Sequence, residues 1–202
     1  TGSWPRCCAK AENQKWEGVR ISDLAQQRGQ DPVDAFLDLA LSEDLQTHFV
    51  GQFFQNRDEG VAPLLKHPAS VITLSDAGAH LSYMCDAGFG LHLLAHWVRE
   101  TGHFSWAEGI RRLTSEPAQR FRIPGRGRLT LGAPADLLLF DPNTVGVSRP
   151  IPRHDLPGGG LRMIRESKGV HGVWVNGTQV FDGQKQLNLA QGPGHVLDRF
   201  DV

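Results

Sequence analysis

The residues best placed to do chemistry follow an apolar segment in the first half of the chain. Val71-Ile72-Thr73-Leu74 runs directly into Ser75-Asp76-Ala77-Gly78-Ala79-His80, a loop of small residues with one carboxylate and one imidazole. An unbroken apolar strand is typical of a parallel sheet that helices cover on both faces. Because the chemistry of such folds lies just past the carboxyl ends of the strands, Asp76 stands where a catalytic group is expected.

Simpler interpretations exist for these and other polar groups. Asp76 could cap the turn or helix that follows it, and His80 could be an ordinary loop histidine. His92 and His96 are four residues apart and could share a metal, but no Glu follows His92, which favours a packed or solvated pair. The segment Gly125-Arg126-Gly127-Arg128 could contact a phosphate, although a turn with charged rims is the favoured interpretation.

Helices are predicted on both sides of the strand. Gly29 should end a helix over residues 23–28 that Ser22 caps, and Asp31-Pro32 should begin another. The spacing of apolar residues predicts that this second helix buries one face, formed by Val33, Phe36, Leu37, Ala40 and Leu41. Three more helices are expected over 58–66, 89–101 and 106–114, the last opened by the capping box Ser105-Trp106-Ala107-Glu108.

The pattern changes at Pro124 to short strands and turns. Strands are predicted at Leu129 and Leu131 and over 136–140, followed by a loop-rich stretch over 148–169. Residues 170–175 and 178–181 flank Asn176-Gly177, which is the strongest short signal for a β-hairpin. The second half therefore reads as a small β unit after a layer of helices and strand, an α/β arrangement.

Composition limits the kinds of partner. The chain has 202 residues, 40% of them hydrophobic, and a net charge of −1, so nothing favours nucleic acid or an acidic membrane surface. No apolar run approaches the length of a membrane span, and residues 1–10 do not resemble a signal peptide. Three cysteines do not form a disulfide framework, which favours a reducing, cytoplasmic location.

Three stretches in this order resemble the C-terminal part of the amidohydrolase superfamily, in particular its D-aminoacylase (N-acyl-D-amino-acid deacylase) family. The first is Ser75–His80 after an apolar strand. The second is Thr114-Ser115-Glu116-Pro117-Ala118, followed by Gly127-Arg128-Leu129 and, after a short turn, Ala135-Asp136-Leu137. The third is Val175-Asn176-Gly177 within the predicted hairpin.

The resemblance implies a fold and an activity. The fold would be α/β, the C-terminal part of an amidohydrolase-type (β/α) barrel plus a small β-sandwich subdomain. Residues 1–123 would form the last strand-helix units of the TIM-type barrel, and 124–202 the sandwich. The activity would be hydrolysis of the C–N bond of N-acyl (D-)amino acids or related amides, at a centre that usually holds zinc. Asp76 would be both a catalytic residue and a metal ligand, and His80 would contact the small-molecule substrate.

The sequence departs from the family pattern in ways that affect activity. It contains no His-x-His pair, and only 70 residues precede Val71, whereas a full barrel needs about 250. Ser82-Tyr83-Met84 stands where the family usually has His-Pro-Arg, so the sequence identifies no arginine for a substrate carboxylate. We therefore expect zinc to be absent or partial and the chain alone to be inactive. The start at Thr1-Gly2-Ser3 suggests a fragment, and exposed sheet edges predict self-association.

Two other readings remain open from the sequence. The chain could be a non-catalytic module that kept the family fold and lost its chemistry. Alternatively, the parent could be a hydantoinase-like or dihydroorotase-like cyclic amidase, which the spacing of metal ligands in the whole gene would separate from a deacylase.

Overall fold

The computed structural model describes residues 3–51 and 57–198 and divides the chain into two compact units, residues 1–64 and 65–202. Among the described residues, no helix has both the length and the apolar character that crossing a membrane requires.

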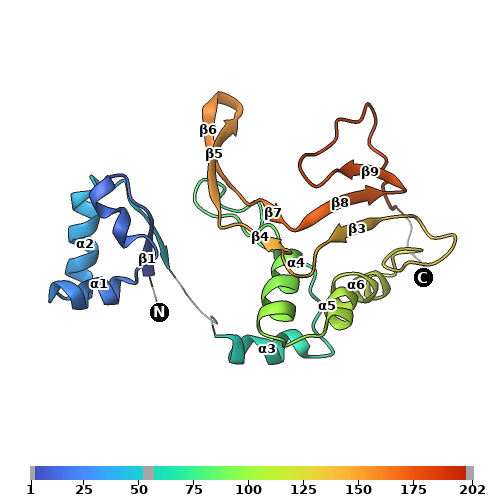
Figure 1. Ribbon diagram of the computed structural model, residues 1–202, viewed down its shortest axis with the longest axis horizontal. Coiled ribbons are helices and arrows are strands. Elements are labelled where there is room, and N and C mark those ends of the chain that lie inside the picture. The colour runs from blue at the N-terminus through green and yellow to red at the C-terminus, as the bar shows by residue number, and fades with distance from the viewer. Residues whose placement is uncertain (1–2, 52–56, 199–202) are drawn as a thin grey trace. The chain divides into compact units, whose positions relative to one another are not determined.

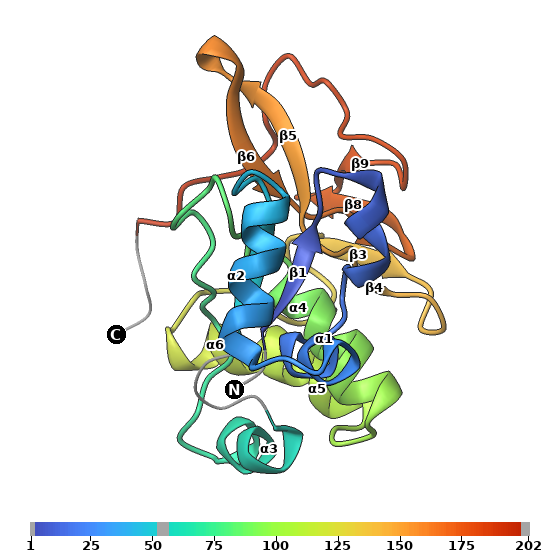
Figure 2. The same ribbon diagram turned by 90° about the vertical axis from the view of Figure 1, so that its left-hand side faces the viewer.

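The first unit packs two helices beside a two-stranded antiparallel sheet (Figures 1 and 2). Its core is formed by Ile21, Leu24, Ala25, Ala35 and Leu39, with Trp16, Phe36 and Phe49 packed against it. The elements are β1 (Ser3–Cys7), the 3-10 helix η1 (Ala11–Trp16), α1 (Ile21–Arg28), α2 (Pro32–Ser42) and β2 (His48–Gly51).

Local signals place α1 and α2 correctly. The predicted cap of α1 is wrong, and the predicted face of α2 is right only for Phe36 and Ala40. Gly29 ends α1 in a left-handed conformation, and the Asp31 carboxylate accepts a hydrogen bond from Val33 N at 2.8 Å. Arg20, not Ser22, is the N-cap of α1. On α2 the buried residues are Ala35, Leu39 and Ala40, whereas Val33 and Leu41 are each 64% exposed and Leu37 is also exposed. Apolar residues of α2 occupy most sides of the helix, so the spacing of apolar residues alone could not identify which side is buried.

A fully buried carboxylate holds the first unit together. Glu43 accepts hydrogen bonds from the backbone N–H groups of Ala9 and Lys10 and from Asn13 Nδ2. Burial opposes its charge, but the bonds from Asn13, Lys10 and Ala9 outweigh that effect and hold the pKa of Glu43 below its ordinary value of 4.5. The charged form is therefore the one that the folded unit needs.

This pKa shift predicts acid sensitivity. Because the Glu43 pKa is lower in the folded than in the unfolded chain, its contribution to stability is complete above pH 4.5 and is lost as the pH falls through the folded pKa. In thermal unfolding followed by circular dichroism, Glu43→Gln should lower the melting temperature at pH 7 and flatten its fall in acid. Glu12→Gln, at an exposed position on η1, should preserve the wild-type pH profile. Identical profiles for the two variants would contradict this role.

The second unit begins within α3 (Asp58–Lys66) and packs a group of helices beside small antiparallel sheets. The helix predicted over 89–101 is present as α4 (Phe89–His92) and η2 (Leu93–Glu100), which winds as a π-helix and ends with Thr101 N bonded to His96 O at 2.9 Å. α5 (Trp106–Leu113) opens as predicted, with Ser105 Oγ accepting from Glu108 N at 3.2 Å. α6 (Ser115–Arg120) follows it.

Three antiparallel sheets form the rest of this unit. The largest has the order β3-β8-β9, and its strands lie side by side in Figure 1. The predicted hairpin is confirmed, because Asn176 (φ 46°) and Gly177 (φ 79°) take the left-handed conformations that a type I′ turn requires. The strands are β3 (Leu137–Phe140), β4 (Gly146–Val147), β5 (Ile151–Leu156), β6 (Gly160–Ile164), β7 (Ser167–Lys168), β8 (Val170–Val175) and β9 (Thr178–Phe181).

Three predictions for this unit are wrong. Val71–Leu74 is not a strand, because no described strand lies beside it to complete its backbone hydrogen bonds, and Leu74 is 87% exposed. Leu129 and Leu131 are also outside strands and largely exposed. The stretch 148–169 is less irregular than expected, since β5 and β6 pair as a hairpin around the short 3-10 helix η3 (Pro157–Gly159).

The residues in 52–56, including Phe53 and Phe54, lie outside the described part.

Candidate functional site

Asp76 lies in an exposed turn rather than at the end of a strand. Ala79 N donates to the backbone oxygen of Asp76 at 3.3 Å, and Ala77 N donates to Ser75 Oγ at 3.3 Å. The backbone of Asp76 and the Ser75 hydroxyl thus make the turn. Within the described residues, no hydrogen bond or ion pair involves the Asp76 carboxylate, so this side chain is not a cap.

The structure brings Asp76 together with groups from three other segments. A cavity of about 400 Å³ is lined by Ser75, Asp76, Asp86, Ala87, Gly88, Phe89, His92 and Arg165. Two carboxylates, one imidazole and one guanidinium therefore face a common space, which we call the Asp76 cavity. Such a set can accept a proton, donate one and pair with an anionic group of a ligand.

The elements around the cavity explain how its distant residues meet. His92 is the last residue of α4, and its ring stacks on that of His96 in η2 with centroids 5.2 Å apart. Arg165 follows β6 and donates from Nε to the backbone oxygen of Cys85 at 2.7 Å. This bond joins the end of the β5–β6 hairpin to the segment that carries Asp86. The cavity is consequently built across residues 75–165, inside the second unit.

The second predicted site residue, His80, is not among the residues that line the cavity. Its backbone is left-handed (φ 50°), and its ring stacks on Tyr83 with centroids 5.0 Å apart. Asp86, His92 and Arg165 are the lining groups that sequence reasoning did not assign to the site. Only His92 had a signal, its spacing to His96, and that signal favoured a packed or solvated pair. The two rings stack, and His92 is exposed.

The described residues do not form a metal centre. Across 3–51 and 57–198, no group of three or more His, Cys, Asp and Glu side chains is placed to hold an ion. Asp76, Asp86 and His92 share a cavity without making such a cluster. His92 and His96 likewise lack a third ligand in this part of the chain.

Comparison of the sequence with known proteins identifies its family. The amidohydrolase family profile matches residues 8–181. The chain belongs to the amidohydrolase family. An N-acyl-D-aspartate deacylase and a D-aminoacylase, both of Alcaligenes xylosoxydans, are 36% and 35% identical to it over 110 and 107 residues, about half of this chain and 19% and 20% of the relatives. An uncharacterized protein of Mycobacterium bovis is 33% identical over 179 residues, 82% of this chain and 28% of the relative.

Solved structures confirm the likeness at the level of the fold. A D-aminoacylase crystal structure, described as defining a novel subset of amidohydrolases, aligns with 94% of this chain at a TM-score of 0.51 and 22% identity. A second D-aminoacylase structure, from work on its binuclear metal centre, aligns with 94% at a TM-score of 0.50. This chain covers 36% of each of those chains, so this amidohydrolase sequence spans roughly a third of their length.

Proposed function

We propose that this amidohydrolase chain supplies one wall of an active site that hydrolyses the amide C–N bond of N-acyl amino acids or related amides. The observation that carries the proposal is the Asp76 cavity, where Asp76 shares a space with Asp86, His92 and Arg165. Support also comes from relatives named as deacylases of N-acyl-D-aspartate and as D-aminoacylase.

Each charged group of the cavity has a role in this proposal. The Asp76 carboxylate takes the proton of the attacking water and delivers it to the leaving amine, the general acid–base role that suits an exposed, unpaired carboxylate. Arg165 provides a cation for the carboxylate of an N-acyl amino acid, a role for which the sequence had offered no residue. His80 remains a proposed substrate contact from the loop that follows Asp76.

The metal expected from the family does not fit the residues that the structure describes. Zinc in such an enzyme lowers the pKa of bound water to about 7, but the described residues offer no cluster of three ligands. The proposed steps therefore use only residues of this chain, and the zinc ligands other than Asp76 would belong to a longer enzyme. Its barrel would include residues 1–123, its sandwich residues 124–202, and Val71–Leu74 would gain strand partners there.

An assay of the 202-residue protein tests this proposal. Purified protein is dialysed against zinc and mixed with N-acetyl-D-aspartate, N-acetyl-D-glutamate and N-acetyl-D-leucine, while bound zinc is measured by atomic absorption. We expect turnover no greater than buffer and less than one zinc per chain. Robust turnover together with stoichiometric zinc would show that the chain holds a complete centre, and the proposed division of the site would be abandoned.

A further inference from the structure

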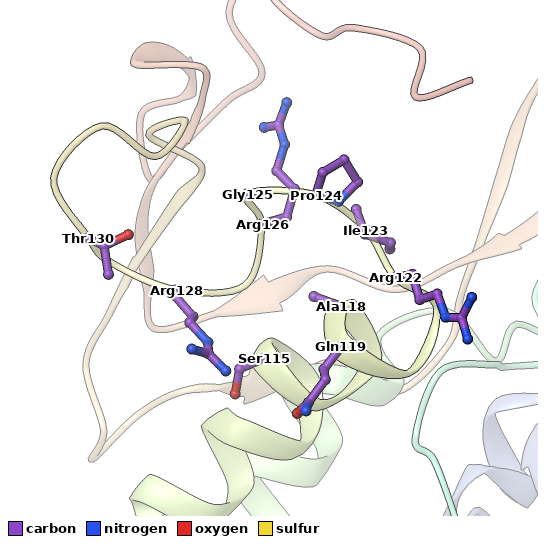
Figure 3. A pocket seen from close by; sticks show the side chains of 10 residues that line it. All are labelled: Ser115, Ala118, Gln119, Arg122, Ile123, Pro124, Gly125, Arg126, Arg128 and Thr130. Carbon is purple, nitrogen blue, oxygen red and sulfur yellow. The ribbon is translucent and has the colours of Figure 1, made fainter. Parts of the chain in front are cut away.

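A second cavity in the same unit carries arginines and no acidic residue. It has a volume of about 600 Å³ and lies between α6 and the loop that follows it (Figure 3). Its lining consists of Ser115, Ala118, Gln119, Arg122, Ile123, Pro124, Gly125, Arg126, Arg128 and Thr130. We call it the arginine cavity; none of its lining residues belongs to the Asp76 cavity.

One of the three arginines fixes the loop rather than awaiting a ligand. Arg126 pairs with the Asp136 carboxylate and donates to Asn176 Oδ1 at 3.1 Å, and only 17% of its side chain is exposed. Asp136 in turn accepts from Asn176 N at 2.8 Å, beside the β8–β9 turn. The loop is thus anchored to the β3-β8-β9 sheet, which holds the neighbouring arginines in place.

The other two arginines are available to bind an anion. Arg122 and Arg128 are exposed, and neither guanidinium has a hydrogen bond or ion pair to another described residue. Figure 3 shows Arg128 extending toward Ser115, with Gln119 close to that serine, whereas Arg122 extends to the opposite side of α6 and Arg126 points away. Ser115 and Gln119 add a hydroxyl and an amide donor beside the Arg128 guanidinium. Because Arg126 is paired with Asp136, Arg128 supplies the positive charge beside these donors.

We propose that the arginine cavity binds a phosphate group, either free phosphate or the phosphate monoester of a small molecule. A phosphate monoester carries a charge of about −1.5 to −2 at pH 7 and offers three acceptor oxygens, which match the Arg128 guanidinium, the Ser115 hydroxyl and the Gln119 amide. The volume also suits a small molecule attached to the phosphate. This inference is independent of the proposed hydrolase activity.

Calorimetric titration at constant ionic strength tests the site. Inorganic phosphate and ribose 5-phosphate are the probes. The ionic strength is held constant so that a change in the screening of the protein's charges is not mistaken for binding. We expect Arg128→Gln to weaken binding about tenfold or more, since a charge-assisted hydrogen bond is lost. Arg149→Gln, an exposed arginine outside the cavity with the same change of charge, should alter affinity less than twofold.

The outcomes separate the alternatives. If ribose 5-phosphate binds more tightly than phosphate, the ligand is a phosphorylated small molecule. If the two bind equally, the ligand is free phosphate. Either result supports the site, provided that Arg128→Gln weakens the binding. No binding of either probe at 10 mM, or equal losses in Arg128→Gln and Arg149→Gln, would overturn the proposal. Circular dichroism of both variants confirms that the fold is unchanged.

Discussion

Arg112→Met should destabilise the second unit by about 3–5 kcal/mol, because it would leave the buried Glu116 carboxylate with only a longer ion pair, 3.5 Å to Arg111. Arg112 is 2% exposed and Glu116 is 7% exposed. Arg112 Nη1 donates to both carboxylate oxygens of Glu116, at 3.0 and 2.9 Å, and to Ser70 O at 2.9 Å. Its Nη2 donates to Leu65 O, so one side chain joins α5, α6 and the segment that leads to Asp76.

Urea unfolding with matched variants measures this effect. Arg111→Met changes the same residue type one position earlier. Arg111 is 48% exposed, pairs with Glu108 at 2.8 Å and reaches Glu116 only at 3.5 Å, so a loss below about 1 kcal/mol is expected. The double variant Arg112→Met with Glu116→Gln should lose less than the sum of the two single losses, since the uncompensated charge is gone. Equal losses for Arg111→Met and Arg112→Met would contradict the role of the buried pair.

Gly169→Ala should destabilise the second unit by about 3 kcal/mol. Gly169 lies between β7 and β8 with φ 63°, and its oxygen accepts from Asp141 N at 2.8 Å. A Cβ atom there would lie 2.5 Å from Val145 N and 2.6 Å from Thr144 Oγ1. The first of these atoms is backbone of a fully buried residue and cannot move aside cheaply.

Gly132→Ala separates the two causes. Gly132 also has a positive φ (83°), but a Cβ atom there would meet nothing within 4 Å. Its loss should be limited to the conformational cost, about 1 kcal/mol. The difference between the two variants in urea unfolding then reports the steric clash at Gly169. A Gly169→Ala loss no larger than that of Gly132→Ala would mean that the contact with residues 144–145 is not tight.

Local chemistry explains which elements could be predicted from the sequence. The start of α2 at Asp31-Pro32, the cap at Ser105 and the turn at Asn176-Gly177 depend on a few adjacent residues, and all three are confirmed. The β5–β6 hairpin was missed because Arg153, His154 and Asp155 give it no alternation of apolar and polar residues. The four central residues of β5, 152–155, are all exposed, so this strand shows no alternation between a buried and an exposed face.

Elements that depend on distant partners could not be predicted in the same way. Val71–Leu74 has the composition of a buried strand, but strand formation needs neighbours that the described residues do not supply. The site shows the same limit: Asp76 was identified from its loop, whereas Arg165 reaches the cavity only because β6 and the Cys85 backbone bring it there. No spacing in the sequence connects those two residues.

The most direct test of the central claim is the turnover of the enzyme encoded by the full reading frame, with and without the Asp76 carboxylate. For N-acyl-D-amino acids, Asp76→Asn should lower kcat by about 10²–10⁴-fold, with a small change in KM. Asp155→Asn, which removes a carboxylate paired with Arg162 on the β5–β6 hairpin, should leave kcat within about twofold. A kcat for Asp76→Asn within threefold of the unaltered enzyme would contradict the assignment of Asp76 as the proton-transferring group.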